Sequence, residues 1–275
     1  MVRHRQESYI LRARQRFGKY RIERRLGQGG FAYVYAAMDT IEGVRVALKM
    51  PHQNVVTSTM LESFQREARL VAQLDHPNIL PLKDASFIEG RFVIASRLGE
   101  RTLTERLRKR MSFETALELS LQMVSAVAYA HRKKIIHCDI KPENMILLPD
   151  GRLQLADFGI ARVAQNTVVG SGSGTVGYMA PEQAMGRPST KSDVFSLGLI
   201  MYRMFTGTLP EWPFEWPMKG YPALRRRAHP ELVAVLRKAM EVRPNKRYRD
   251  ADEMLSALQR VKRRALLFYH RKRKA

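Results

Sequence analysis

Residues 137–159 read HCDIKPENMILLPDGRLQLADFG, and this stretch decides the fold. It begins with three polar side chains close together, Asp139, Lys141 and Asn144, and ends with Asp157, eighteen residues after Asp139. Between them, two apolar runs flank Pro-Asp-Gly, which predicts a β-hairpin. A lone Asp-Phe-Gly would be an ordinary turn after a strand, but its place after this hairpin favours a functional role.

These four side chains suit one chemistry. Asp139 can accept the proton of a hydroxyl or orient it for attack, and Lys141 can neutralise charge on a phosphoryl group in transfer. Asn144 offers a neutral oxygen and Asp157 an anionic oxygen, which are the ligands that Mg²⁺ prefers. The set is typical of phosphoryl transfer.

A glycine-rich stretch and a lysine lie upstream. GQGGFAYV (27–34) joins two predicted strands, and its glycines let backbone N–H groups approach an anion. Alone it would more often be a hairpin turn, and a strand rather than a helix follows it, which argues against a dinucleotide fold. Lys49 in VALKM is costly to bury unless a phosphate or a carboxylate meets it, and Glu67 is the candidate carboxylate.

The periodicity of apolar residues changes along the chain. Strands are predicted at 20–27, 31–38, 44–50 and 91–96, with a helix at 58–74 between the third and the fourth. From about residue 102 the pattern is helical. It includes a long buried helix before HCD and others at 193–205 and 251–269, the last with RKRK (271–274) beyond its end. Residues 168–177 are rich in Gly and Ser and predict a mobile loop.

Composition bounds the class of protein. With 275 residues and 45% apolar composition the chain can bury a substantial core. No apolar run is long enough to span a bilayer, no secretory signal is present, and the single Cys excludes an internal disulfide framework. We therefore expect a cytoplasmic protein, peripheral at the membrane if its basic ends bind lipid.

The net charge of +22 is concentrated at the ends. Residues 1–25 hold nine Lys or Arg against two Glu, and residues 259–275 hold eight against no acidic residue. Such ends suit an anionic membrane surface, nucleic acid or an acidic protein, and the alternative is a solubilising, solvated tail.

Seven motifs in order make the chain resemble a eukaryotic-type (Hanks-type) serine/threonine protein kinase of the kind found in bacteria. The match covers roughly residues 17–260. The seven motifs are GQGGFAYV (27–34), VALK (46–49), REA with Glu67, HPNI (76–79), HCDIKPEN (137–144), DFG (157–159) and YMAPEQ (178–183), and SDVFSLG (192–198) follows them. The resemblance also implies that Asp193 braces the catalytic loop and that Arg247 pairs with Glu182. Lys141 and Thr175 stand where serine/threonine-specific members carry them.

The resemblance implies an α+β, two-lobed protein kinase fold with the active site in the cleft. A basic extension would cover 1–16 and the kinase domain 17–260. Within that domain we expect a small β-rich N-lobe at about 17–96 and a larger α-helical C-lobe at about 97–260. Residues 261–275 would complete the last helix and form a basic tail.

The resemblance also implies the site. ATP and Mg²⁺, with Mn²⁺ as the alternative metal, would be the cofactors, and a protein Ser/Thr hydroxyl the acceptor. The catalytic residues would be Asp139, Lys141, Lys49 and Glu67, and the metal ligands Asn144 and Asp157. The nucleotide would contact Gly27, Gln28, Gly29, Gly30, Val34, Ala47, Lys49 and, at the back of the pocket, Ala95.

Several positions depart from the family pattern. Ala32 replaces the third glycine, and the expected hinge at 94–103 lacks the usual acidic-aromatic pair. Cys138 stands where many members carry Arg, so a phosphate on the activation segment lacks its usual partner. A pseudokinase scaffold is the alternative function, but such chains usually lose a lysine or an aspartate equivalent to Lys49, Asp139 or Asp157.

Overall fold

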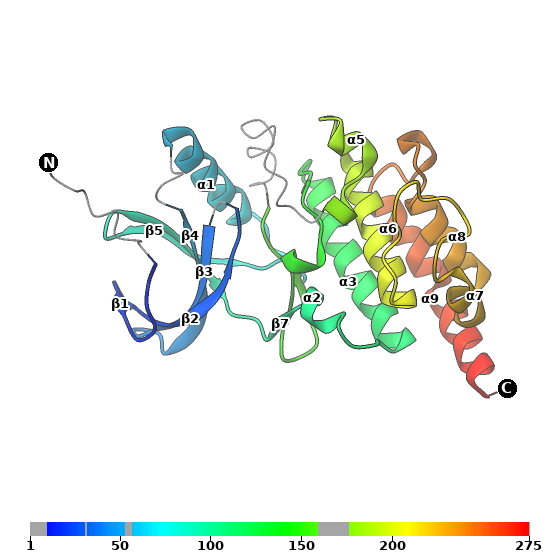
Figure 1. Cartoon of the computed structure of the whole chain (residues 1–275), viewed down its shortest axis with the longest axis horizontal. Coiled ribbons are helices and arrows are strands. Elements are labelled where there is room, and N and C mark those ends of the chain that lie inside the picture. The colour runs from blue at the N-terminus through cyan, green and yellow to red at the C-terminus, as the bar shows by residue number, and fades with distance from the viewer. Residues whose placement is uncertain (1–9, 31, 53–56, 159–175, 275) are drawn as a thin grey trace, which may run out of the picture. The chain divides into compact units, whose positions relative to one another are not determined.

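A computed structural model describes residues 10–30, 32–52, 57–158 and 176–274. They form two compact units: unit 1 is Met1–Gln73 with Pro81–Leu98, and unit 2 is Leu74–Leu80 with Gly99–Ala275. Unit 1 is rich in strands and unit 2 is mostly helical, which confirms the expected fold class (Figure 1). The expected limits of the domain and of its two ends stay predictions.

Unit 1 contains one antiparallel sheet with the strand order β1-β2-β3-β4-β6-β5. Four of its strands were expected from the sequence. The strands are β1 (Arg16–Phe17), β2 (Tyr20–Gln28), β3 (Ala32–Asp39), β4 (Val44–Pro51), β5 (Leu82–Ile88) and β6 (Arg91–Arg97). The predicted helix is α1 (Ser58–Val71), on which the Phe64 ring lies 6.4 Å from Phe92 of β6.

The core of unit 1 lies on one face of this sheet. Alternate residues of the central strands point into it, including Tyr35, Leu48 and Ala95. Leu11 and Phe17 cover this face, and the backbone N–H of Leu11 donates to the Tyr35 hydroxyl at 3.2 Å. The opposite face therefore carries the other half of each strand, including Lys49.

Unit 2 begins with the predicted hairpin. Strands β8 (Met145–Leu147) and β9 (Leu153–Leu155) pair antiparallel, and β7 (Arg101–Thr102) extends the sheet on the other side of β8. The turn places Gly151 at φ +81°, a conformation that favours glycine. Residues 74–80 belong to unit 2 because Asn78 donates to the Leu153 carbonyl at 2.9 Å and Ile79 bridges to Leu155.

Helices make up most of unit 2. They are α2 (Leu103–Arg106), α3 (Phe113–Arg132), α5 (Pro181–Ala184), α6 (Thr190–Thr206), α7 (Tyr221–Arg227), α8 (Pro230–Ala239) and α9 (Ala251–Lys274), with 3-10 turns η1 (Pro142–Asn144), η2 (Val176–Tyr178) and η3 (Pro244–Lys246). Ser112 caps α3 through a hydrogen bond from the Thr115 N–H, and Gly207 ends α6 at φ +77°. Both α6 and α9 pack against α3 (Figure 1).

The last helix is longer than expected. Its buried stripe includes Met254, Leu258, Val261 and Ala265, as the sequence predicted, with Phe268 only half-buried. The expectation that RKRK (271–274) lies beyond the end of the helix is wrong, because these four residues continue the helix to Lys274, with their side chains exposed. Within the described ranges, no helix is both long and apolar enough to cross a membrane.

Candidate active site

Three predicted catalytic side chains meet in unit 2, on the loop that follows α3. The Lys141 ammonium lies 2.7 Å from Oδ2 of Asp139, and the Asn144 amide donates to the same Oδ2 and to the Asp139 carbonyl, both at 2.9 Å. The Asp139 side chain keeps 32% of its surface exposed and that of Lys141 22%. The carboxylate is thus held by two donors while part of it still faces solvent.

The contacts of Asn144 test whether a metal ion fits here. Its Nδ2 is committed to Asp139, which leaves the amide oxygen as the atom suited to a hard cation. The Asn144 carbonyl accepts the N–H of Ala156 at 2.8 Å, so the chain passes Asn144 immediately before Asp157. An amide oxygen and a carboxylate fit Mg²⁺ when phosphate and water oxygens complete its shell. Among the described residues no group of three or more His, Cys, Asp or Glu could hold a metal.

A buried carboxylate from α6 fixes the backbone of the loop. Asp193, 1% exposed, accepts the N–H of His137 at 2.8 Å and that of Cys138 at 2.9 Å. His131 lies 3.0 Å from the same carboxylate through Nε2 and accepts the Ala251 N–H through Nδ1, which assigns the ring hydrogen to Nε2. This confirms the bracing role that the family resemblance implied for Asp193.

His137 connects the loop to the segment after the hairpin. Its Nδ1 accepts the Asp139 N–H at 3.2 Å, and its Nε2 donates to the Ala156 carbonyl at 3.0 Å. The ring also packs against Phe158 with centroids 4.7 Å apart. One side chain therefore sets the backbone beside both Asp139 and Asp157, a role that the sequence analysis did not assign.

Cys138 occupies a strained position between these groups. Its φ of +64° lies in the left-handed region, which costs a residue with a Cβ about 1–2 kcal/mol. Its carbonyl accepts a hydrogen bond of 2.5 Å from Nε2 of Gln183, a residue of α5 that is 5% exposed. Asp193 and Gln183 thus hold the two polar backbone groups of Cys138, and its thiol is buried.

A second buried ion pair lies beside α5. Arg247 pairs with Glu182 through two bonds of 2.6 and 2.9 Å and donates to the carbonyls of Lys191, Glu241 and Val242, so all five of its N–H groups are used. Burial would raise the pKa of Glu182, but the hydrogen bonds from Arg247 and Ser192 outweigh it and hold this pKa below its usual value. The implied partnership of Arg247 and Glu182 is confirmed.

The predicted nucleotide-binding residues of unit 1 form a row across the sheet. Gly27 pairs with Val34, Val34 with Lys49, and Lys49 with Ile94, so these residues share one face. Ala47 is on this face too, because it lies two residues from Lys49 along β4. No described atom comes within 4 Å of a Cβ built on Gly27, which leaves room for a ligand.

The expectation for Ala95 is wrong in register. Ala95 pairs with Leu48 and Asp84, is fully buried, and belongs to the core on the opposite face from Lys49. Ile94, half-buried and opposite Lys49, has the orientation that was expected of Ala95. A one-residue shift reverses the face in a strand, and VIAS alone does not settle it.

The glycine turn has a clamp that the sequence analysis missed. The Gly29 N–H donates to the Ala32 carbonyl at 2.9 Å, and Nε2 of His52 lies 2.9 Å from the Gly29 carbonyl. The His52 ring packs edge-on against Tyr33 with centroids 4.2 Å apart. Gln28 ends β2 opposite Tyr33 and Gly30 follows in the turn.

Some expectations fall where no test is possible. Glu67 lies within α1, but its side chain is outside the described part of the chain, so its pairing with Lys49 stays a prediction. The Ser and Thr residues of the expected activation segment (Thr167, Ser171, Ser173 and Thr175) and its cation Arg162 also lie outside the described residues, as does most of the loop expected at 168–177.

Comparisons with known proteins agree with this geometry. The family model described as "Protein kinase domain" matches residues 20–259. The chain is 36% identical over 201 residues to the serine/threonine-protein kinase PrkC of Bacillus subtilis and 34% identical over 264 residues to the serine/threonine-protein kinase PknA of Nostoc. These alignments cover 70% and 88% of this chain but only 31% and 47% of those relatives.

A solved structure gives the same result for the fold. The PknI kinase domain of Mycobacterium tuberculosis superimposes with a TM-score of 0.70 at 26% identity, covering 91% of this chain and 99% of that one. The similarity thus extends over nearly all of that domain, whereas the curated relatives are about two to three times as long as the part that matches.

The Gln183 contact predicts a defect in rate rather than in binding. Gln183→Met keeps the size of the side chain but leaves the Cys138 carbonyl without its donor, so the loop can relax around Asp139. We expect phosphoryl transfer from ATP to lose about tenfold in kcat while KM for ATP changes little. Gln154→Met is the matched control, because Gln154 is equally buried and donates to the Pro77 carbonyl away from the loop. Equal kcat in the two variants would show that the contact does not position Asp139.

Proposed function

We propose, from the premise that this chain belongs to the protein kinase family, that it transfers the γ-phosphoryl group of ATP to Ser or Thr hydroxyls of protein substrates, itself included. One observation carries the proposal. Asp139, Lys141 and Asn144 are held together on a backbone that Asp193 and His137 fix, which is the arrangement that the reaction needs.

Each residue of the loop has a chemical role in this proposal. Asp139 accepts a hydrogen bond from the acceptor hydroxyl and aligns it for attack. It takes the proton of this hydroxyl as the new P–O bond forms and the bond from the γ-phosphorus to the β–γ bridging oxygen breaks, so that ADP leaves with that oxygen. Lys141, 2.7 Å from Asp139, places its positive charge beside the attacking oxygen and offsets the charge of the phosphoryl oxygens. The donation from Asn144 to Oδ2 keeps the carboxylate in one orientation.

The nucleotide side of the reaction falls to the other predicted residues. Asn144 and Asp157 would hold Mg²⁺ or Mn²⁺, which supplies neutralisation of the phosphate charge when bound. Lys49 would contact the α- and β-phosphates, with Glu67 orienting it, while Gly27, Gln28, Gly29 and Gly30 cover them. Val34, Ala47 and, in place of Ala95, Ile94 would contact the base, because they share a face of the sheet with Lys49.

Substitutions of these residues test the assignment. Asp139→Asn keeps the shape of the side chain but removes the base, so we expect transfer to fall by a factor of roughly 10²–10⁴. Lys49→Met and Asp157→Ala should abolish it. The readout is radiolabel from γ-labelled ATP on the protein itself and on a generic basic protein. Asp75→Asn and Lys109→Met, both at exposed positions, are the matched controls.

The same experiment separates catalysis from a scaffold role. A pseudokinase would show no transfer in the unmodified chain, and each variant would then match it. Near-normal turnover in Lys49→Met, Asp139→Asn or Asp157→Ala, with contaminating kinases excluded, would overturn the site assignment. Unfolding curves for every variant keep loss of the fold apart from loss of chemistry.

We also propose that activity does not require a phosphate on the activation segment. An arginine at position 138 would provide a cation for such a phosphate, whereas the buried thiol of Cys138 provides none. The hydrogen bond from the Cys138 N–H to Asp193 and the one from Gln183 to the Cys138 carbonyl supply the order that the loop needs at this residue. Thr167, Ser171, Ser173 and Thr175 can then be phosphorylated without switching the protein on.

Dephosphorylation tests this independence. The purified protein, treated with phosphatase and freed of it, should show an initial rate within about twofold of the phosphorylated form. The variant with Thr167, Ser171 and Ser173 changed to Ala should behave alike. A lag, or a large loss of initial rate, would instead mean that another cation has taken the place of the missing arginine.

We propose, finally, that the basic ends bind an anionic surface, with an acidic membrane as the first candidate and nucleic acid or an acidic protein as the alternatives. The four residues Arg271, Lys272, Arg273 and Lys274 form an exposed, cationic helical turn at the end of α9. Each such cation near an acidic bilayer contributes about 1 kcal/mol.

Removal of residues 271–275 tests the membrane proposal. Co-sedimentation with phosphatidylserine vesicles should weaken clearly and fall with added salt, whereas phosphatidylcholine vesicles should bind neither form. A gel shift with nucleic acid, measured in parallel, distinguishes the alternatives. Binding without salt dependence, or equal binding by the shortened chain, leaves only a solubilising tail.

A further inference from the structure

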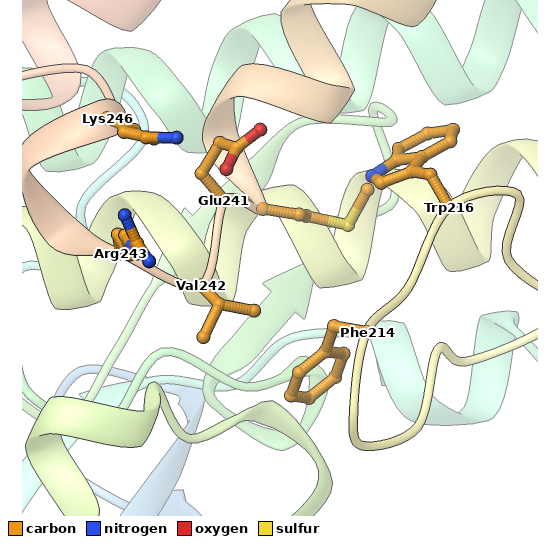
Figure 2. Close-up of a pocket in the computed structure, with 7 residues that line it drawn as sticks. Phe214, Trp216, Glu241, Val242, Arg243 and Lys246 are labelled. Carbon is orange, nitrogen blue, oxygen red and sulfur yellow. The ribbon is translucent and has the colours of Figure 1, made fainter.

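A groove lies in unit 2 between the loop after α6 and the segment after α8 (Figure 2). Its volume is about 320 Å³, and it is lined by Phe214, Trp216, Met240, Val242, Arg243 and Lys246, with Glu241 beside them. We propose that this groove binds an acidic segment of a protein partner through a large apolar side chain flanked by carboxylates. The inference rests on the proposed function only in taking that partner to be a substrate.

The apolar part of the groove is fixed from behind. Phe214 packs edge-on against Phe195 of α6 with centroids 5.1 Å apart, and Trp216 packs edge-on against Tyr202 and Tyr221 at 6.0 and 5.4 Å. Phe195 and Tyr202 are fully buried, so both groove rings lean on the core of unit 2. This apolar wall is preorganised in the free protein, which lowers the entropic cost of binding a partner.

The cationic part lies apart from the rings. Figure 2 shows Arg243 and Lys246 together on one side of the groove, with Phe214 and Trp216 on the other. Arg243 and Lys246 are exposed, and a third cation, Arg237, lies 5.9 Å from the centre of the Trp216 ring. Of the lining residues, Glu241 alone is acidic. The groove therefore offers an apolar surface beside a net positive one.

Charge decides which occupant fits. The chain carries a net charge of +22, and both of its ends are strongly basic. Like charge disfavours the chain's own ends, and a second copy of the chain, as occupants of a cationic groove. An acidic partner is attracted to the same cationic rim that repels the chain's own ends and a second copy. Aromatic or large aliphatic side chains supply the anchor that such a pocket needs.

The back of the groove is rigidly connected to α5. The carbonyls of Glu241 and Val242 accept hydrogen bonds from Arg247, whose guanidinium also pairs with Glu182. All donors of Arg247 are already satisfied, so a docked segment need not rearrange this pair. We therefore expect the groove to raise affinity for substrates that carry the segment, lowering their KM, without changing kcat.

Direct binding is the primary test. The probe is a fluorescein-labelled pool of octapeptides in which Glu alternates with positions drawn from Phe, Leu, Trp and Met, and the comparison pool has Lys in place of Glu. Fluorescence anisotropy should show salt-sensitive binding of the acidic pool alone. Arg243→Glu with Lys246→Glu, and separately Trp216→Ala, should each weaken it about tenfold.

Matched controls keep the test specific. Lys109→Glu with Arg110→Glu makes the same charge change at two exposed positions before α3 and should leave binding within about twofold. Trp216→Leu keeps an apolar wall, so it reports on the aromatic anchor even where Trp216→Ala fails to fold. Equal binding by the two pools, no binding of either pool, or equal weakening in the control pair overturns the proposal.

Catalysis is read separately. Transfer to a generic basic protein should be unchanged in the groove variants, because none of the substituted residues contacts the loop around Asp139. Lost peptide binding with retained transfer supports the groove. If the acidic peptides still bind but neither the unmodified chain nor any variant transfers phosphate, the proposed function is refuted and the groove proposal is not.

Discussion

The carboxylate of Asp193 is the interaction on which the rest of unit 2 depends. It is almost completely buried, and an unpaired charge there would cost several kcal/mol. Donors from His137, Cys138 and His131 satisfy it, and His131 is itself held by the first residue of α9. One anion thus joins three long helices, α3, α6 and α9, to the loop that carries Asp139.

The Arg247–Glu182 pair is a second buried charge whose hydrogen-bonding groups are all satisfied, but here the central group is a cation. There the buried cation is central, and one carboxylate and three carbonyls surround it. Gln183, the next residue, reaches the Cys138 carbonyl, so the two networks meet on a helix of four residues. A short helix with little intrinsic stability is placed by its side-chain partners rather than by its own backbone hydrogen bonds.

Much of this arrangement follows from the sequence, because motif spacing fixes which residues meet. The hairpin between Asn144 and Asp157, the strands around Lys49 and the partners of Asp193 and Arg247 were all expected, and each depends on local pattern or on family resemblance. The prediction for Ala95 failed because successive residues of a strand point to opposite faces, and the residues next to Ala95 are apolar on both faces, so the sequence does not show which face Ala95 occupies. His52 and Gln183 were missed because a single side-chain-to-carbonyl bond across 23 or 45 residues leaves no periodic signal.

The position of the only cysteine allows opening of the catalytic loop to be measured by thiol labelling of the unmodified protein. Cys138 is 3% exposed and lies between the loop's two backbone anchors, and the chain has no second thiol. A thiol reagent can reach it only when the loop opens, so the labelling rate of the unmodified protein measures that opening equilibrium when the loop recloses faster than the reagent reacts. Nucleotide or partner that stabilises the closed loop must slow the labelling by the same free energy. The residue that breaks the family pattern therefore makes the motions of the catalytic loop visible without an introduced probe.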